Sequence, residues 1–298
     1  MSWGFSAHKE LHAVAISALP HPLFSLFKTH QLTIIEKSIA ADRRKHIVES
    51  EAEKHYIDLD LVNDSTSERG TLPSTIIKVY NNLVYQMSMC AVGGDSSSTI
   101  ESVIRISADL GHYIGDAHVP LHTTYNYNGQ FSGQTGIHAL WETHVYEITR
   151  PSWKPRQVKA TYIMDVESWS NAIITSSHQL VNEVLSKEES VRLRVDAPPL
   201  WGYRTRGRTM DIIPTPSFCR EYADSLNDMV ELRFYESAQG IASAWYSAWI
   251  DAGCPDLNKL RSSKSESKNA FQDLLQDLRE LVEDVPFLHL QKQDTLQP

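Results

Sequence analysis

Cysteine is scarce in this sequence of 298 residues. The three present, Cys90, Cys219 and Cys254, are too few and too widely spaced for a disulfide framework or a cysteine-ligated zinc site. No apolar run approaches the ~20 residues that a membrane-spanning helix needs. Basic residues are not in excess either, because 28 Lys and Arg face 37 Asp and Glu and the net charge is −9. This balance argues against a nucleic-acid coat protein, so we expect no stable nucleic-acid partner.

The first residues show no secretion signal. Met1-Ser2-Trp3-Gly4-Phe5 provides neither a basic segment nor an apolar run of the kind that signal peptides contain. From this feature alone we expect a cytosolic protein, or a chain recorded without its leader.

Helical periodicity dominates the chain. Hydrophobic residues make up 41% and charged residues 22%, which is typical of a globular protein. Only 161–164 and 209–213 resemble strands, and we expect long loops at 58–71, 123–136 and 189–215. We therefore predict an all-α, single-domain multi-helix bundle with long loops around a cleft. Its expected helices are 7–19, 31–41, 73–92, 96–115, 137–149, 166–188 and 216–252, the last with a kink at Gly240.

The C-terminal part differs in composition from the rest. We place one domain in residues 1–257, and a polar linker with an amphipathic helix in residues 258–298. Residues 270–284 alternate Leu and Phe with acidic residues at helical spacing. This helix either packs back on the domain or binds a partner.

Histidine is frequent, with 13 residues in the chain. His112 and Asp116 are four residues apart, and so are His138 and Glu142. On a helix, each pair shares one face and can bind one metal ion. Imidazole and carboxylate ligands without thiolate suit Zn²⁺ in a catalytic site. Such pairs also form ordinary surface contacts, so a single pair would be a weak indication.

Three further histidines lie in the same region. Pro120 ends the expected helix that carries His112 and Asp116, and His122 follows just beyond it as another candidate ligand. His118 and His144 fit no pair, and we interpret them as surface residues or as supports of the ligands.

Six ordered segments carry most of the distinctive His, Asp and Trp residues: WGFSAH (3–8), AADRR (40–44), HYIDLD (55–60), LGHYIGDAHVPLHTTYNYNGQ (110–130), GIHALWE (136–142) and WYSAWIDAG (245–253). In this order they resemble the zinc-dependent phospholipase C and S1/P1 nuclease superfamily, most closely its bacterial phospholipase C-like branch. The segments span nearly all of the chain before its tail. The resemblance implies an all-α fold that holds three Zn²⁺ ions in a cleft.

The resemblance also implies which residues bind these ions. The first ion would be bound by Asp42, His55, His112 and Asp116. The second would be bound by His8, a bridging Asp116 and the main chain of Trp3. The third would be bound by His122, His138 and Glu142.

The implied activity is hydrolysis of a phosphodiester by a hydroxide that bridges two of the ions, with the third stabilising charge on a phosphoryl or leaving oxygen. Asp42 and Asp116 would then be the catalytic carboxylates, Asp42 as a ligand or as a base. The resemblance further implies an extracellular or periplasmic location, although the start of the chain leaves a cytoplasmic one open.

Three positions bear on the substrate and the second ion. Met1 and Ser2 precede Trp3, whose counterpart in secreted members offers a free terminal amine, so the second ion would bind more weakly here. Glu142 matches the phospholipases, since the nucleases have Asp at this position. Ser6 replaces the choline-binding Glu of phosphatidylcholine-preferring members, which leaves the head-group preference open.

We therefore expect a zinc-dependent phosphodiester hydrolase of the phospholipase C type. An S1/P1-type single-strand nuclease is the first alternative, and a non-catalytic zinc-binding or partner-binding protein is the second. The expected substrate is a phospholipid or a nucleic acid, with transient contact with a membrane surface in the first case. The sequence leaves the oligomeric state open.

Substrate contacts are less well indicated. Tyr125 and Asn126 lie between two ligand sets and either line the substrate entrance or belong to a loop held by its own turns. Arg206, in YRTRGR (203–208), either binds a phosphate or belongs to a solvated basic loop. We expect Trp201, Trp245 and Trp249 in the core rather than as platforms for stacked bases.

Overall fold

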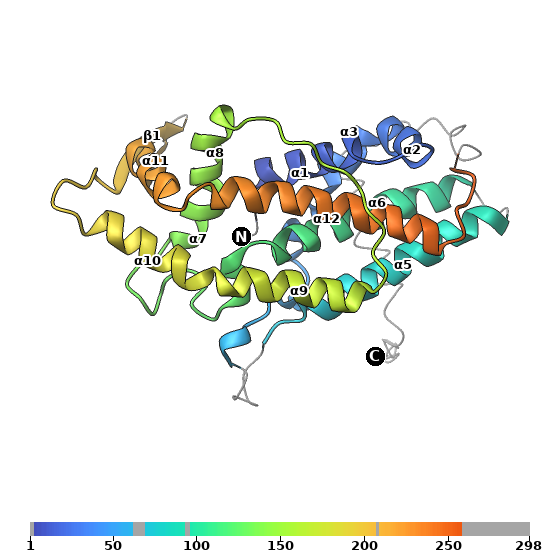
Figure 1. Cartoon of the computed structure of the whole chain (residues 1–298), viewed down its shortest axis with the longest axis horizontal. Coiled ribbons are helices and arrows are strands. Elements are labelled where there is room, and N and C mark those ends of the chain that lie inside the picture. Colours follow the sequence, from blue (N-terminus) through green and yellow to red (C-terminus); the bar gives the residue numbers. More distant parts are fainter. Residues whose placement is uncertain (1–2, 62–68, 93–95, 207–208, 258–298) are drawn as a thin grey trace, which may run out of the picture. The chain divides into compact units, whose positions relative to one another are not determined.

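The computed structural model describes residues 3–61, 69–92, 96–206 and 209–257, which belong to one compact unit. The described part is predominantly helical, which confirms the predicted all-α class (Figure 1). The predicted linker and helix of 258–298 lie outside the described residues. The α-helices are α1 (Phe5–Ser17), α2 (Leu23–Thr29), α3 (Gln31–Lys37), α4 (Ala40–Arg44), α5 (Leu72–Val92), α6 (Ser96–Ala117), α7 (Ile137–Ala139), α8 (Tyr146–Thr149), α9 (Val166–Gln179), α10 (Val181–Arg192), α11 (Pro216–Ser225) and α12 (Met229–Asp251). The 3₁₀ turns are η1 (Glu49–His55), η2 (Leu59–Leu61), η3 (Pro120–Thr123) and η5 (Arg150–Ser152), η4 (Leu140–Val145) is a π-helical segment, and the strands are β1 (Trp201–Arg206) and β2 (Thr209–Pro214).

Helix α12 is the central packing element of the fold. It contacts α1, α5 and α6, and its small residues, with Ile241 and Trp245, are buried on most sides of the helix. The indole of Trp245 is fully buried, and its Nε1 donates a hydrogen bond to the carbonyl oxygen of Ser107 in α6 at 2.9 Å. This packing fixes α6, whose C-terminal half carries His112 and Asp116.

Helices α1 and α6 approach each other closely because two glycines of α6 face α1. A Cβ at Gly111 would lie 2.4 Å from His12 Nε2, and a Cβ at Gly115 would lie 3.1 Å from His8 Cε1. Larger residues at these positions would push α1 away. The two glycines therefore bring His8 to the face of α6 on which the candidate ligands lie.

Several predicted helices divide into shorter ones. The range 166–188 is interrupted at Leu180, between α9 and α10. The range 216–252 is interrupted before α12, where Asn227 and Asp228 adopt positive φ angles of 50° and 62°. Helix α12 continues through Gly240 without a break. A Cβ at Gly240 would lie 3.1 Å from His118 Cε1, so this glycine allows close packing instead.

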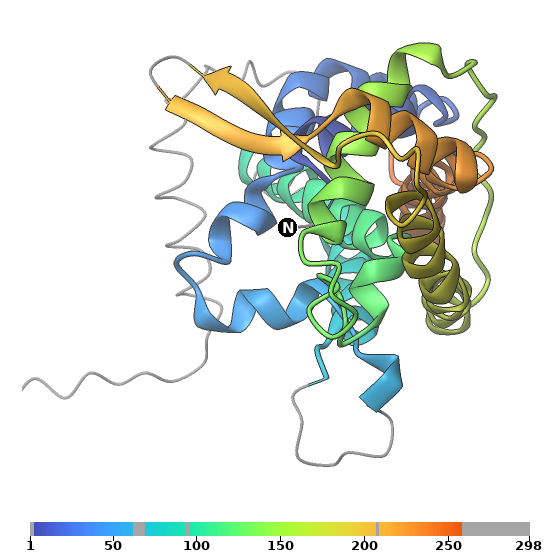
Figure 2. The ribbon, with the colours of Figure 1, turned by 90° about the vertical axis from the view of Figure 1, so that its left-hand side faces the viewer.

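The strand predictions were correct in one place and wrong in two. Strand β2 confirms 209–213, and it pairs antiparallel with β1, which we had placed in a loop (Figure 2). Residues 161–164 do not form a strand. The backbone N–H groups of Thr161 and Ile163 donate instead to the hydroxyls of Ser243 and Ser247 in α12, at 3.1 and 2.8 Å.

The tryptophans and His118 differ partly from expectation. Trp245 is a core residue and Trp249 is partly buried against the core, but Trp201 is 48% exposed on the hairpin, so its prediction was wrong. His118 is buried, and its Nδ1 hydrogen-bonds the carbonyl oxygen of Ile114 at 2.7 Å, which excludes a surface position.

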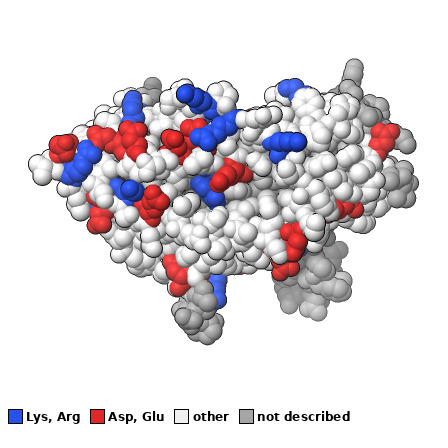
Figure 3. Space-filling view, viewed as in Figure 1, with Lys and Arg blue, Asp and Glu red and all other residues white. Residues whose placement is uncertain are grey.

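The surface charges and the helices agree with two features of the sequence, the absence of a basic excess and the absence of long apolar runs. Acidic and basic side chains alternate over the described surface that Figure 3 presents, with no extended basic area on that face. Among the described helices, none combines the length and the apolar character that crossing a membrane requires.

Candidate metal centre

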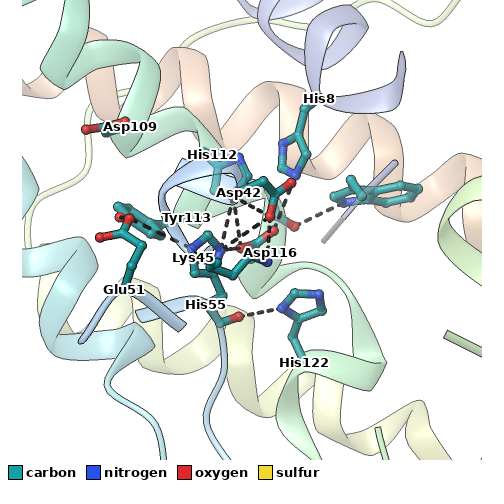
Figure 4. A network of polar contacts seen from close by, with 12 residues as sticks. His8, Asp42, Lys45, Glu51, His55, Asp109, His112, Tyr113, Asp116 and His122 are labelled. Carbon is teal, nitrogen blue, oxygen red and sulfur yellow. Dashed lines mark hydrogen bonds and ion pairs between the residues drawn. The ribbon is translucent and has the colours of Figure 1, made fainter. Parts of the chain in front are cut away.

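Five buried side chains from four segments meet beside the C-terminal half of α6 (Figure 4). The segments are distant in the sequence, and the packing of α1, α4 and η1 around α6 brings them together. We call this the five-residue cluster, and its members are His8 of α1, Asp42 of α4, His55 of η1, and His112 and Asp116 of α6.

Asp116 is at the centre of the five-residue cluster. Its Oδ2 lies 2.8 Å from His55 Nδ1 and 3.4 Å from His112 Nε2. Its Oδ1 faces the other way and lies 3.4 Å from His8 Nε2. The two carboxylate oxygens therefore point to different imidazoles, an arrangement suited to a carboxylate shared by two cations.

Asp42 lies on another side of the same imidazoles. Its Oδ1 is 3.6 Å from His112 Nε2 and 3.9 Å from His55 Nδ1. Two overlapping groups have donor atoms within 4.8 Å of one another, His8 with Asp42 and His112, and His55 with His112 and Asp116. The structure thus brings together all four residues expected at the first ion and His8 of the second, with His112 common to both groups.

A second cluster forms from His122, His138 and Glu142, which we call the three-residue cluster. His138 Nε2 lies 2.9 Å from Glu142 Oε2 and 3.1 Å from His122 Nε2. His122 Nε2 lies 3.7 Å from the same Glu142 oxygen. This is the set expected at the third ion, and all three side chains are buried.

Backbone carbonyl groups fix the orientation of two histidines. His112 Nδ1 lies 2.8 Å from the carbonyl oxygen of Ser38, and His122 Nδ1 hydrogen-bonds the carbonyl oxygen of His55. Since a carbonyl group only accepts, each Nδ1 carries the proton and donates it. Each Nε2 is then left with a lone pair directed into its cluster, as in histidines that bind metal ions.

Several buried atoms of the clusters lack hydrogen bonds. Within the part of the chain that the structure describes, neither ring nitrogen of His8, neither carboxylate oxygen of Glu142, nor Asp116 Oδ1 makes a hydrogen bond of regular geometry. All three side chains are fully buried, where such atoms are costly. Divalent cations would satisfy them, and donors of this type, imidazole and carboxylate without thiolate, fit Zn²⁺.

Burial keeps the imidazoles neutral. It lowers the pKa of His8 to about 4 and holds the pKa values of His55 and His112 well below the ordinary value. At neutral pH these rings therefore keep a lone pair for a ligand bond.

The carboxyl groups are shifted in opposite directions. Burial alone would raise the pKa of Asp42, but the protonated form of His112 and the ammonium group of Lys45 outweigh it and lower that pKa below the ordinary value. Burial raises the pKa of Asp116 well above its usual value, and that of Glu142 also rises because it is buried. A bound cation would favour the ionised form of both groups.

A buried network behind His55 was not predicted from the sequence. Glu51 Oε1 accepts hydrogen bonds from Tyr113 Oη at 2.6 Å and from Arg44 Nη2 at 3.0 Å, and Arg44 also pairs with Asp109. Glu51 Oε1 lies 3.9 Å from His55 Nε2. The network therefore holds η1 and α4 against α6. The four-residue spacing of Glu51 and His55 is the one sequence feature that could have indicated it.

Lys45 was also missed. Its Nζ lies 2.5 Å from Asp42 Oδ1, and its side chain is largely covered. It places a cation at the edge of the five-residue cluster. Its position three residues after Asp42, on the same side of a helix, was the available indication.

Trp3 supports the site through its side chain. The indole is fully buried, its Nε1 donates to the carbonyl oxygen of Gly115 at 3.0 Å, and it packs on Trp141 with ring centroids 5.0 Å apart. Trp3 therefore fastens the start of α1 to α6 and to the π-helical segment. Residues 1–2 lie outside the described residues.

The structure gives the expected substrate residues other contacts or leaves them outside the described part. The amide of Asn126 is used within its own loop, since Nδ2 donates to Ser132 Oγ and Oδ1 accepts from the Phe131 N–H. Tyr125 is exposed, and its backbone N–H donates to Asp60 Oδ1 at 2.9 Å. Arg206 ends strand β1, and its side chain is outside the described part.

No family model matches this sequence, and no curated protein matches it significantly. A function must therefore be inferred from the chemistry of the two clusters and from the resemblance that their motifs carry.

Proposed function

We propose that this protein is a zinc-dependent hydrolase of phosphodiester bonds, of the phospholipase C type. One observation carries the proposal: five histidines and three carboxylates converge, buried, into two clusters linked by His55. The side chain of His55 belongs to the five-residue cluster, and its carbonyl oxygen orients His122 of the three-residue cluster.

The charge of the clusters suits an anionic substrate. Zn²⁺ ions, when bound, would polarise a phosphoryl oxygen and lower the pKa of water near neutrality. Asp42, Asp116 and Glu142 provide three negative charges, half of what three divalent ions would need for neutrality. The site would thus attract a phosphodiester although the whole chain has a charge of −9.

The position of each charged residue indicates its role in the proposed reaction. Asp116 faces imidazoles on both sides and would hold two ions together. The lowered pKa of Asp42 makes it a poor proton acceptor at neutral pH and favours a ligand role over a general base. The ammonium group of Lys45, beside Asp42, can approach a phosphoryl oxygen of the substrate.

A single-strand nuclease is the second candidate, and Tyr127 is the observation that favours it. Tyr127 is half exposed, and its ring meets the ring of His138 edge-on at 5.8 Å. It could stack on a base next to the three-residue cluster. A non-catalytic zinc protein, the third interpretation, would have the same clusters without turnover.

Metal removal and parallel substrates test the proposal. The purified protein should lose activity in a chelator and regain it with Zn²⁺, measured on phosphatidylcholine, on other phospholipids and on single-stranded DNA. His112→Ala should abolish hydrolysis and reduce bound zinc, whereas His46→Ala, at an exposed histidine near α4, should change neither. Activity that persists in the fully chelated protein would contradict the proposal. Zinc binding without hydrolysis of any of these substrates would favour the non-catalytic interpretation.

A further inference from the structure

The β1–β2 hairpin projects from the helices (Figure 2), and several of its apolar side chains are exposed to solvent. Because side chains alternate along a strand, directly paired residues share a face. Tyr203, Met210 and Ile212 on this face are 76%, 65% and 64% exposed, and Trp201 is half exposed. The outer face comprises the pairs Trp201 with Pro214, Tyr203 with Ile212, and Thr205 with Met210. Apolar side chains of this size, exposed together, indicate an interaction surface.

A second exposed apolar group lies on the loop of residues 123–136. Tyr125 and Phe131 are exposed and stack on each other, with ring centroids 4.9 Å apart. Asp60 fixes the base of this loop by accepting hydrogen bonds from Thr124 Oγ1 and the Tyr125 N–H. The aromatic pair is thus held outward by a defined loop structure.

The hairpin and the loop meet at the base of the hairpin. A cavity of about 230 Å³ is lined by residues 133–136 of the loop and by Trp201 of the hairpin. The loop begins next to His122 and ends just before His138, and Tyr127 contacts the His138 ring. The loop therefore lies beside the three-residue cluster, and the hairpin meets the loop at Trp201.

The local charge of the hairpin is opposite to that of the chain. Residues 201–214 contain three arginines and the single acidic residue Asp211, a net charge of +2 in a protein of net charge −9. Arg204 is exposed and alternates with Trp201 and Tyr203, so it belongs to the other face of the strand. The register partner of Arg204 is Asp211, so the net positive charge of the segment is a property of its sequence. A basic segment with aromatic and aliphatic side chains exposed together is typical of segments that lie in a lipid interface.

We propose that the outer face of the hairpin, together with Tyr125 and Phe131, docks this protein on the surface of a phospholipid bilayer. The apolar side chains would enter the boundary between head groups and acyl chains, and the exposed Arg204 would remain level with the phosphates. The inference rests on the proposed function and deepens it, because it selects aggregated phospholipid as the substrate.

The arrangement of the hairpin favours lipid over single-stranded nucleic acid. Bases stacked on Trp201 and Tyr203 would need cations beside them to contact their phosphates, but Arg204 lies on the opposite face. Met210 and Ile212 add aliphatic surface, which offers little to a stacked base and much to an acyl chain.

Vesicle binding in the presence of a chelator tests docking separately from hydrolysis. The full-length protein would be sedimented with vesicles of phosphatidylcholine and phosphatidylglycerol. The double variant Tyr203→Ser/Ile212→Ser should bind at least about tenfold more weakly than the wild type. Leu32→Ser, which removes a similarly exposed apolar side chain on α3, should bind as the wild type does. Circular dichroism and thermal unfolding of each variant would show that the fold is retained.

The outcomes separate docking from activity. Equal vesicle binding by the double variant and the wild type, or no binding by the wild type, would overturn the docking surface. A dimer that the wild type forms and the double variant loses would also overturn it, because the face would then bind a second copy of the chain. Binding to a single-stranded DNA oligonucleotide that only the double variant loses would overturn it too, because the face would then bind nucleic acid. Vesicle binding that depends on the hairpin, in a protein that hydrolyses no phosphodiester, would retain the surface and reject the proposed function.

Discussion

The two candidate clusters differ in how the chain builds them. The five-residue cluster collects side chains between His8 and Asp116 from α1, α4, η1 and α6. The three-residue cluster needs only the short range between His122 and Glu142. The first therefore depends on the packing of the whole domain, and the second on one loop and one short helical region. This difference predicts unequal effects of substitutions in the two clusters.

The largest effect is expected for His112→Ala, because His112 belongs to both groups of the five-residue cluster. Bound zinc should fall by more than one ion per chain, and hydrolysis by more than about 100-fold, since losing even a supporting residue of a metal site costs about 10–100-fold. Elemental analysis and initial rates would measure both. A loss of a single ion would show that the two groups do not share His112.

A smaller effect on metal content is expected for His138→Ala. This substitution removes a ligand of the three-residue cluster alone, so about one ion should be lost while the five-residue cluster stays occupied. The same elemental analysis applies. Loss of all zinc from this variant would mean that the two clusters do not bind independently.

Acid should destabilise the metal-free protein, with a contribution from a buried histidine that belongs to neither cluster. Burial lowers the pKa of His118 from 6.5 to about 3. Below pH 6.5, His118 therefore binds a proton in the unfolded chain but not in the folded one. Its contribution to the free energy of unfolding falls as the pH drops from about 6.5 toward 4. Above pH 6.5 this contribution does not change. Urea unfolding in a chelator at several pH values would measure the slope.

The variant His118→Gln should flatten this slope, because it removes a titrating group. His46→Gln is the matched control, since His46 is exposed, and its slope should equal that of the wild type. An unchanged slope in His118→Gln would show that this ring does not contribute to the acid sensitivity.

The smallest effect is expected from the network behind the five-residue cluster. Tyr113→Phe removes the hydrogen bond from Tyr113 Oη to Glu51, 2.6 Å long and buried, and should lower the free energy of unfolding by about 1–3 kcal/mol. Urea unfolding would measure it, with Tyr85→Phe at an exposed position of α5 as the control. A change in zinc affinity without a change in stability would assign the network to the metal site rather than to the fold.

Local spacing predicted the helical part of the site. The four-residue intervals from His112 to Asp116 and from His138 to Glu142 place each pair on one helical face, and Pro120 marks the end of α6 before His122. These features depend on neighbouring residues alone, which is why sequence reasoning could find them.

The remaining ligands have no local feature of this kind. His8 meets α6 because α1 packs closely at Gly111 and Gly115. Asp42 and His55 meet it because α4 and η1 are held against α6 by long-range contacts. Only the resemblance joined them to the site before the structure did. The network of Glu51, Arg44 and Tyr113 was missed for the same reason, since its contacts are long-range.

The errors in secondary structure also arise from tertiary contacts. Residues 161–164 have the composition of a strand, but their N–H groups bond to serine hydroxyls of α12. Strand β1 falls in a range for which the sequence predicts a loop, and it forms by pairing with β2. In both places the partner of the segment, rather than its composition, decides the outcome.

His55 couples the two clusters, because its side chain belongs to the five-residue cluster and its carbonyl oxygen orients His122 of the three-residue cluster. An ion lost from the side chain of His55 frees the residue to move, and the carbonyl oxygen that orients His122 then moves with it. Depletion of the five-residue cluster should thus lower the zinc affinity of the three-residue cluster, while either cluster can still be occupied without the other. A stepwise chelator titration would measure this change in affinity.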